Sequence, residues 1–197
     1  MKLLKLASLA GALAFATVHA AEVGKPAPAF TATNVKGESV SLADLKGKVV
    51  VLEWINFECP FVKKHYSGNL QKLQETFTAK DVVWISVNSA AEGNQGYLEG
   101  SKLAAAVAEK GNKATEILVD SSGEVGKAYD AKTTPQLYII NKEGTLVYNG
   151  AIDSLPTTDV SDIEKAEPLF ANALNAVLEG KTVENATNKP YGCGVKY

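Results

Sequence analysis

The spacing of apolar residues changes at residue 59. Residues 48–52 (K-V-V-V-L) form a largely β-branched apolar run, which is typical of a buried central strand. After Pro60 the apolar residues recur at three- and four-residue steps, as on one face of a helix: Val62, Tyr66, Leu70, Leu73 and Phe77. Cys59 therefore lies where a strand ends and a helix begins. We expect this helix to bend at residues 67–69 and to resume to about residue 80.

The rest of the pattern predicts alternating strands and helices. The apolar run at 81–88 indicates a second central strand, and Pro168 should start or kink the last helix. Further strands are expected at 30–34, 39–41, 117–120, 136–141 and 145–149, and helices at 42–45, 97–110, 123–129 and 162–179. This order predicts an α/β sandwich in which helices flank a central mixed β-sheet. We expect one domain over residues 21–180, followed by a C-terminal tail, residues 181–197.

The N-terminus has the pattern of an export signal. A short basic segment, residues 1–5, precedes an apolar run from Leu6 to Val18, and small residues end it at Ala20. The run is too short for a membrane anchor, so residues 1–20 are predicted to be a cleaved signal peptide. The expected location is an oxidising space, most simply the periplasm, without membrane attachment after cleavage.

Charge and cysteine content narrow the function. The net charge is −2, which indicates neither a nucleic-acid nor an anionic membrane partner. All 20 basic residues are lysine. Cys59 and Cys193 are the two cysteines, an even pair that suggests a disulfide in an oxidising compartment. Two cysteines are too few for a structural zinc site, and we expect no metal and no cofactor.

The surroundings of Cys59 favour a reactive thiol. Pro60 suits the first helical position, and the free amides and dipole at a helix start stabilise a thiolate. Lys63 and Lys64 add positive charge one turn later. The alternative is that Cys59 is a small buried hydrophobic residue. His65, six residues after the cysteine, is expected to lie on the far, exposed side of the helix.

A second feature precedes the strand at 136–141. Residues 133–135 read Thr-Thr-Pro, and a proline leading into a strand must take its first position or an edge. On its own this proline would be expected in the common trans form.

Together, Cys-Pro-x-x at a helix start and Thr-Thr-Pro before a hairpin resemble the thioredoxin superfamily. The segments 23–30, 37–38 and 42–48 resemble its redoxin branch, which includes peroxiredoxin-like and periplasmic thioredoxin-like proteins, and imply an N-terminal redoxin-type extension. The resemblance implies that the Thr134–Pro135 bond is cis and lies against Cys59. It also implies that Thr134 pairs with an extended substrate, as in β-augmentation.

Several positions depart from the related families. Val62 stands where thioredoxins have a second cysteine, and Leu52 and Asn56 stand where peroxiredoxins have proline and threonine. The arginine that peroxiredoxins use is missing, although Asn56 is a candidate for orienting a peroxide. Glu53 resembles the buried acid that shuttles the thiol proton in thioredoxins, and burial would raise its pKa. The alternative is a solvated Glu53 facing outward.

The resemblance implies a periplasmic thiol–disulfide oxidoreductase with Cys59 as nucleophile and Cys193 as resolving cysteine. Its partners would be a protein or small-molecule disulfide or peroxide and a thiol reductant. One alternative is a peroxiredoxin-like peroxidase. Another is a non-catalytic binding module in which a Cys59–Cys193 disulfide is a permanent cross-link. The residues before Pro190 are largely polar, so the tail should be mobile when reduction releases it.

Overall fold

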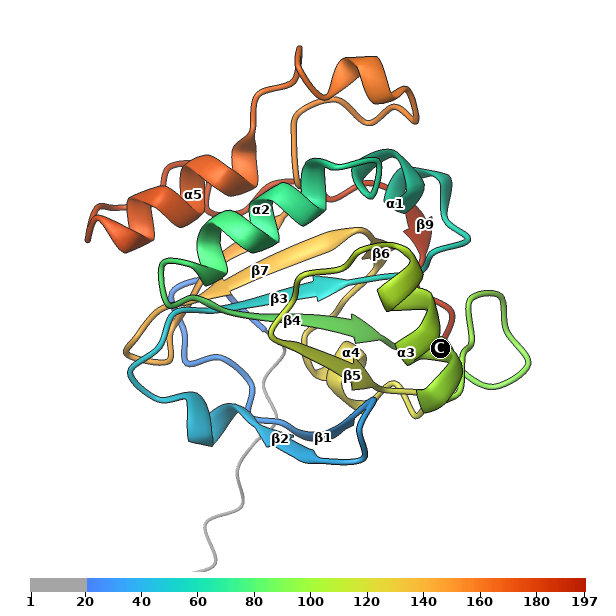
Figure 1. Cartoon of the computed structure of the whole chain (residues 1–197). Coiled ribbons are helices and arrows are strands. Elements are labelled where there is room, and N and C mark those ends of the chain that lie inside the picture. The colour runs from blue at the N-terminus through green and yellow to red at the C-terminus, as the bar shows by residue number, and fades with distance from the viewer. Residues whose placement is uncertain (1–20) are drawn as a thin grey trace, which may run out of the picture.

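Seven strands form one mixed β-sheet in the order β2-β1-β5-β4-β3-β7-β8, and Figure 1 shows the labelled strands from β2 to β7. The computed structural model describes residues 21–197, so the predicted signal peptide lies outside the described residues. The strands of this sheet are β1 (Thr31–Asn34), β2 (Ser39–Ser41), β3 (Val50–Trp54), β4 (Val83–Asn88), β5 (Glu116–Val119), β7 (Gln136–Ile140) and β8 (Leu146–Gly150).

The centre of the sheet follows the apolar runs of the sequence. β3 is buried along its whole length and pairs in parallel with β4, which in turn pairs in parallel with β5. On its other side β3 pairs antiparallel with β7, and β7 and β8 form the predicted hairpin. The prediction of two adjacent central strands is therefore confirmed.

Helices cover both faces of the sheet (Figure 1). The face of Val51 packs against α1, α2, α3 and α5, and the face of Leu52 packs against α4 and the segment before β1. The helices are α1 (Pro60–His65), α2 (Asn69–Thr78), α3 (Gly100–Glu109), α4 (Glu124–Ala128) and α5 (Leu169–Leu178), with single 3-10 turns η1 (Leu42–Leu45) and η2 (Val160–Asp162). None of the helices within residues 21–197 is long and apolar enough to cross a membrane.

Helix boundaries confirm some predictions and correct others. Gly68, with φ of 130°, separates α1 from α2 at the predicted bend. The third helix begins at Gly100 rather than at residue 97, because Tyr97 N–H closes a turn on Asn94 O. The last helix begins after Pro168, one of the two predicted roles of this proline, rather than at residue 162, since proline lacks the N–H needed inside a helix.

The C-terminal tail lies along the end of the sheet at which β3 ends. Its β9 (Cys193–Gly194) pairs antiparallel with β6 (Thr133–Thr134) in a separate two-stranded sheet. Figure 1 shows β9 beside α1, near the carboxyl ends of β3 and β4. The expected mobility of the tail after reduction does not match this arrangement, because both cysteines are free thiols here and the tail is docked.

Candidate active site

Cys59 lies in the turn between β3 and α1, as the change of period predicts. It is the N-cap residue of α1, and its N–H donates to Asn56 O at 3.0 Å. Its side chain is only 1% exposed. The thiol donates to Thr134 O at 3.0 Å, so Cys59 contacts the backbone just before Pro135.

Pro135 has the conformation that the thioredoxin resemblance implies. The Thr134–Pro135 peptide bond is cis, which confirms that prediction. The Gln136 side chain fixes the approach to this bond, because its Oε1 accepts from the N–H groups of Lys132 and Thr133, at 2.8 and 3.2 Å.

Asn56 is buried and its amide is used within the protein. Its Oδ1 accepts from Glu58 N–H at 3.0 Å, and its Nδ2 donates to Gln95 O at 3.2 Å. Gly96 lies against this amide so closely that a Cβ there would come within 2.3 Å of it. The Asn56 side chain therefore ties the Cys59 turn to the loop at residues 90–96.

Cys193 reaches the same place from the tail. It lies opposite Thr134 in the β6–β9 register, and Thr134 Oγ1 donates to Cys193 O at 3.5 Å. Gly192 makes this approach possible, since a Cβ there would lie 2.0 Å from Thr134 O. The structure thus brings Cys59, Thr134, Pro135 and Cys193 together.

The pKa values of the two thiols are shifted in opposite directions. Burial acts to raise the pKa of Cys59, but hydrogen bonds from the Cys193 thiol, the Val62 and Cys193 N–H groups and Thr134 outweigh it, so the pKa is lowered. Burial, the hydrogen bond to Cys59 and the negative charge of Cys59 raise the pKa of Cys193 to about 11. When one proton is lost from the pair, Cys59 therefore becomes the thiolate.

Glu53 is fully buried on the same face of β3 as α2, which excludes the solvated alternative. Neutral groups surround its carboxylate. Oε1 accepts from Tyr66 Oη at 3.0 Å, and Oε2 accepts from Gln74, Trp84 and Ser86 at 2.9, 2.7 and 3.2 Å. Burial raises the pKa of Glu53, and these four hydrogen bonds only partly oppose the shift.

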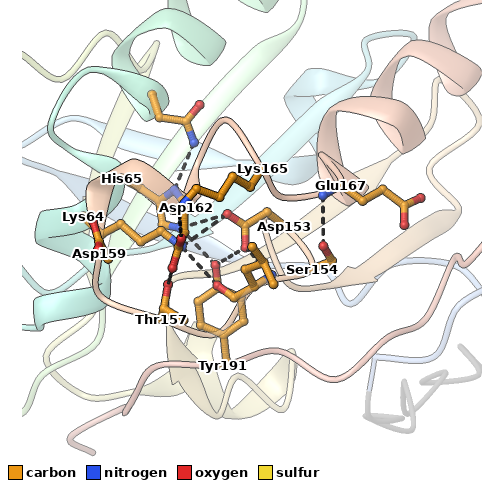
Figure 2. Close-up of polar contacts among 12 residues, drawn as sticks. Lys64, His65, Asp153, Ser154, Thr157, Asp159, Asp162, Lys165, Glu167 and Tyr191 are labelled. Atoms are coloured by element: carbon orange, nitrogen blue, oxygen red, sulfur yellow. Dashed lines mark hydrogen bonds and ion pairs between the residues drawn. The ribbon is translucent and has the colours of Figure 1, made fainter.

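A cluster of charged and polar side chains behind α1 was missed by the sequence reasoning. We call Lys64, His65, Asp153 and Tyr191 the tail cluster, and Figure 2 shows these side chains converging. His65 is 0% exposed, so the expectation of a surface position is wrong. Lys64 is also buried, and its Nζ lies 3.5 Å from Asp153 Oδ2. The charge of Lys64 is therefore directed at Asp153 rather than at Cys59.

Tyr191 joins this cluster from the tail, two residues before Cys193. Its hydroxyl donates to Asp153 Oδ1 and lies 3.0 Å from His65 Nε2. Burial lowers the pKa of His65 to about 4, with Asp153 opposing and Lys64 supporting the shift, so the imidazole is neutral at pH 7. A polar loop, residues 151–168, and a polar tail cover these groups, which explains why apolar periodicity does not reveal them.

The geometry suits two-electron thiol chemistry. A thiol with a lowered pKa, a second thiol beside it and a backbone edge for an adjacent strand are the required parts. Within residues 21–197 there is no group of three or more His, Cys, Asp or Glu side chains that could hold a metal ion.

Curated relatives share part of the chain. Sporulation thiol-disulfide oxidoreductase A of Bacillus subtilis is 31% identical over 130 residues, which cover 64% of this chain and 73% of that protein. Thiol-disulfide oxidoreductase ResA of B. subtilis is 28% identical over 134 residues, covering 68% and 69% of the two chains.

Solved structures extend the similarity to most of the chain. An uncharacterized conserved protein from Geobacillus kaustophilus superposes with a TM-score of 0.74 at 31% identity, covering 89% of this chain and 92% of that one. A hypothetical protein from Sinorhizobium meliloti gives a TM-score of 0.75 at 24% identity, covering 91% and 96%, which shows the fold.

The model of the AhpC/TSA family matches residues 23–149. This match includes Cys59, Thr134 and Pro135 but ends before Cys193. The chain therefore belongs to the AhpC/TSA family and is a redox enzyme of the redoxin branch of the thioredoxin superfamily.

Proposed function

We propose that the protein is a thiol–disulfide oxidoreductase in which Cys59 is the nucleophile and Cys193 the resolving cysteine. The observation that carries this proposal is the paired arrangement of the two thiols at Thr134, with a lowered pKa at Cys59 and a raised one at Cys193. The names of the curated relatives support the same reaction class.

The reaction runs in two exchange steps. The Cys59 thiolate attacks one sulfur of a substrate disulfide, forming a mixed disulfide and releasing the other sulfur as a thiolate. Cys193 then loses its proton to solvent and attacks Cys59 Sγ. This attack forms the Cys59–Cys193 disulfide and releases the second substrate thiolate. The substrate gains two electrons, and a thiol reductant returns two electrons to the protein.

The acidity of Cys193 is suited to the second step. Part of its raised pKa comes from the hydrogen bond to Cys59 and from the negative charge there. Both contributions disappear once Cys59 is bonded to substrate sulfur. Cys193 therefore becomes easier to deprotonate at the stage that requires its thiolate.

In this structure β9 occupies the β6 edge at Thr134. We propose that substrate backbone pairs with Thr134, beside Pro135, when it displaces β9. Asn56 holds the Cys59 turn, and Glu53 acts from the core as a proton reservoir for the thiol chemistry, since burial raises its pKa. We propose residues 1–20 as a signal peptide, residues 21–180 as the redoxin domain and the periplasm as the location. N-terminal sequencing of protein released from the periplasm should begin at Ala21.

The decisive test compares Cys193→Ser with Cys59→Ser. Reduced wild-type protein treated with oxidised glutathione should yield a Cys59–Cys193 peptide in non-reducing mass spectrometry. Cys193→Ser should stop at a Cys59–glutathione mixed disulfide, and turnover with a dithiol reductant should fall by at least tenfold. Cys59→Ser should form neither species at pH 7. Unchanged turnover in Cys193→Ser would remove Cys193 from the mechanism.

The burial of Cys59 favours one second candidate, a peroxidase. A thiol that is 1% exposed is reached more easily by hydrogen peroxide than by a bulky disulfide. Peroxide would oxidise Cys59 to a sulfenic acid, and Cys193 would displace water to form the same disulfide. Stopped-flow mixing of reduced protein with peroxide distinguishes the candidates: fast consumption at low peroxide supports the peroxidase, and slow consumption supports disulfide exchange. A disulfide potential below about −300 mV would instead indicate a structural cross-link.

A further inference from the structure

We infer that Tyr191 is a positioning residue that holds Cys193 against Cys59 by docking on Asp153 and His65. This inference rests on the proposed function, because it concerns how the resolving thiol is kept in place. In this inference the tail cluster sets the effective concentration of the Cys193 thiol at Cys59.

The Tyr191 hydroxyl has a defined place in a chain of hydrogen bonds. Asn69 Nδ2 lies 2.9 Å from His65 Nδ1 and donates to it, so the neutral imidazole carries its proton on Nε2. His65 Nε2 then donates to Tyr191 Oη over 3.0 Å, and Tyr191 donates to Asp153 Oδ1. Burial, this hydrogen bond and the charge of Asp153 raise the pKa of Tyr191, so the phenol remains a donor.

The buried charges of the tail cluster favour a docked tail. Asp153 and Lys64 are both buried, and Lys64 Nζ also donates to Leu155 O at 3.0 Å and lies 5.8 Å from the Tyr191 ring centroid. Without Tyr191, Asp153 Oδ1 would lose a charged-group hydrogen bond and would keep only the Leu155 N–H at 3.0 Å. A docked Tyr191 is therefore strongly favoured over an undocked one.

The cluster connects the two cysteines through one short helix. Lys64 and His65 end α1, which begins directly after Cys59, and Tyr191 precedes Cys193 by two residues. Phe61 of the same helix packs edge-on against Tyr191, with ring centroids 5.6 Å apart. When Tyr191 is docked, the tail and the nucleophile are thus fixed to the same element.

On one side this part of the tail borders an open space. A cavity of about 630 Å³ lies beside residues 188–192, between them and the 151–156 segment, and Thr133 and Leu169 also line it. The tail is anchored on either side of the cavity, by Asn188 on Tyr148 and by β9 on β6. Between these anchors, Tyr191 makes the charged contact nearest to Cys193.

Docking and disulfide formation should therefore be coupled. If docking raises the formation constant of the Cys59–Cys193 disulfide, the disulfide must stabilise docking by the same factor. Loss of the Tyr191 hydroxyl should lower the effective concentration of the thiols by about tenfold, the usual scale for one hydrogen bond to a charged group. The corresponding rise in reduction potential is about 30 mV.

The test is the equilibrium of full-length mature protein with reduced and oxidised glutathione, followed by mass spectrometry. Tyr191→Phe should shift the equilibrium about tenfold toward the dithiol. Tyr129→Phe is the control, because it removes a buried hydroxyl bond to Pro28 O, in the segment before β1 rather than in the tail cluster. It should lower Tm comparably and leave the thiol equilibrium unchanged. A Tyr191→Phe equilibrium within twofold of wild type would overturn the inference.

A second readout separates this inference from the proposed function. If the wild-type protein forms no Cys59–Cys193 disulfide, the proposed function fails, and the alkylation rate of Cys193 by iodoacetamide in reduced protein tests Tyr191 instead. Faster alkylation of Cys193 in Tyr191→Phe than in Tyr129→Phe supports positioning. Equal rates in these two variants overturn it.

Discussion

Glu53 and Asp153 are both buried carboxylates, yet their partners differ in kind. Glu53 accepts four hydrogen bonds, all from neutral side chains. Asp153 faces the ammonium of Lys64 and accepts from Tyr191, and it lies 3.7 Å from His65 Nε2. One acid lies within the core of the domain, whereas the other joins α1, a loop and the tail.

The partners of a buried acid therefore decide its role. Neutral donors only partly offset the loss of hydration, so the pKa of Glu53 is raised. A buried cation makes each ion depend on the other, and removal of either leaves an uncompensated charge. We therefore expect Glu53 to influence chemistry and Asp153 to hold the structure of the site.

The largest expected effect comes from breaking the ion pair. Asp153→Leu leaves Lys64 buried without its carboxylate and should lower the free energy of unfolding by about 3–5 kcal/mol at pH 7. The double variant Lys64→Met, Asp153→Leu is the control and should recover most of the loss. Urea unfolding measures both. If Asp153→Leu is as stable as the wild type, the cluster does not have the structural role we assign it.

A smaller effect with a defined pH sign is expected at His65. Its folded pKa of about 4 lies below the ordinary 6.5, so the unfolded chain binds more protons between these values. Stability from the neutral ring is complete above pH 6.5 and is lost as the pH falls toward 4. From pH 6.5 to 5 the wild type should lose about 1.5 kcal/mol more than His65→Gln. Parallel stability curves for the two proteins would contradict this shift.

Glu53 should give the smallest change, with the opposite sign. Its folded pKa is raised above 4.5, so its contribution is complete below pH 4.5 and is lost as the pH rises through the folded value. Glu53→Gln removes this loss, and its stability relative to wild type should increase by up to about 1.4 kcal/mol per pH unit in that window. Denaturant unfolding from pH 4 to 8 measures the slope. A relative stability that does not change with pH would show that Glu53 keeps an ordinary pKa.

The sequence contained enough to predict the sheet and the Cys59 turn from local patterns, a β-branched run and a change of period. The cis Thr134–Pro135 bond was predicted only through the thioredoxin resemblance, because a proline before a strand is usually trans. The resemblance also pointed to Glu53 as a buried acid, but the apolar strand alone left a solvated position open.

The tail cluster could not be predicted from the sequence, for a physical reason. An unbroken amphipathic helix from Pro60 would expose His65, six residues after Cys59. In the structure α1 ends at His65, and its outer side is covered by residues 151–168 and by the tail. Both segments are polar and lack periodicity, so their path over α1 depends on hydrogen bonds such as those of Asn188 with Ala151 and Tyr148. The polar sequence of the tail therefore predicted mobility, whereas the tail is docked in the structure.

Gly192 restricts which segments can pair with the β6 edge. Its φ of 137° and its closeness to the Thr134 carbonyl leave no room for any side chain immediately before Cys193. A foreign polypeptide that displaced β9 and bound in the same register would meet the same restriction. The edge therefore admits a segment in this register only if it carries a glycine at the position of Gly192, whatever the charge or polarity of its other residues.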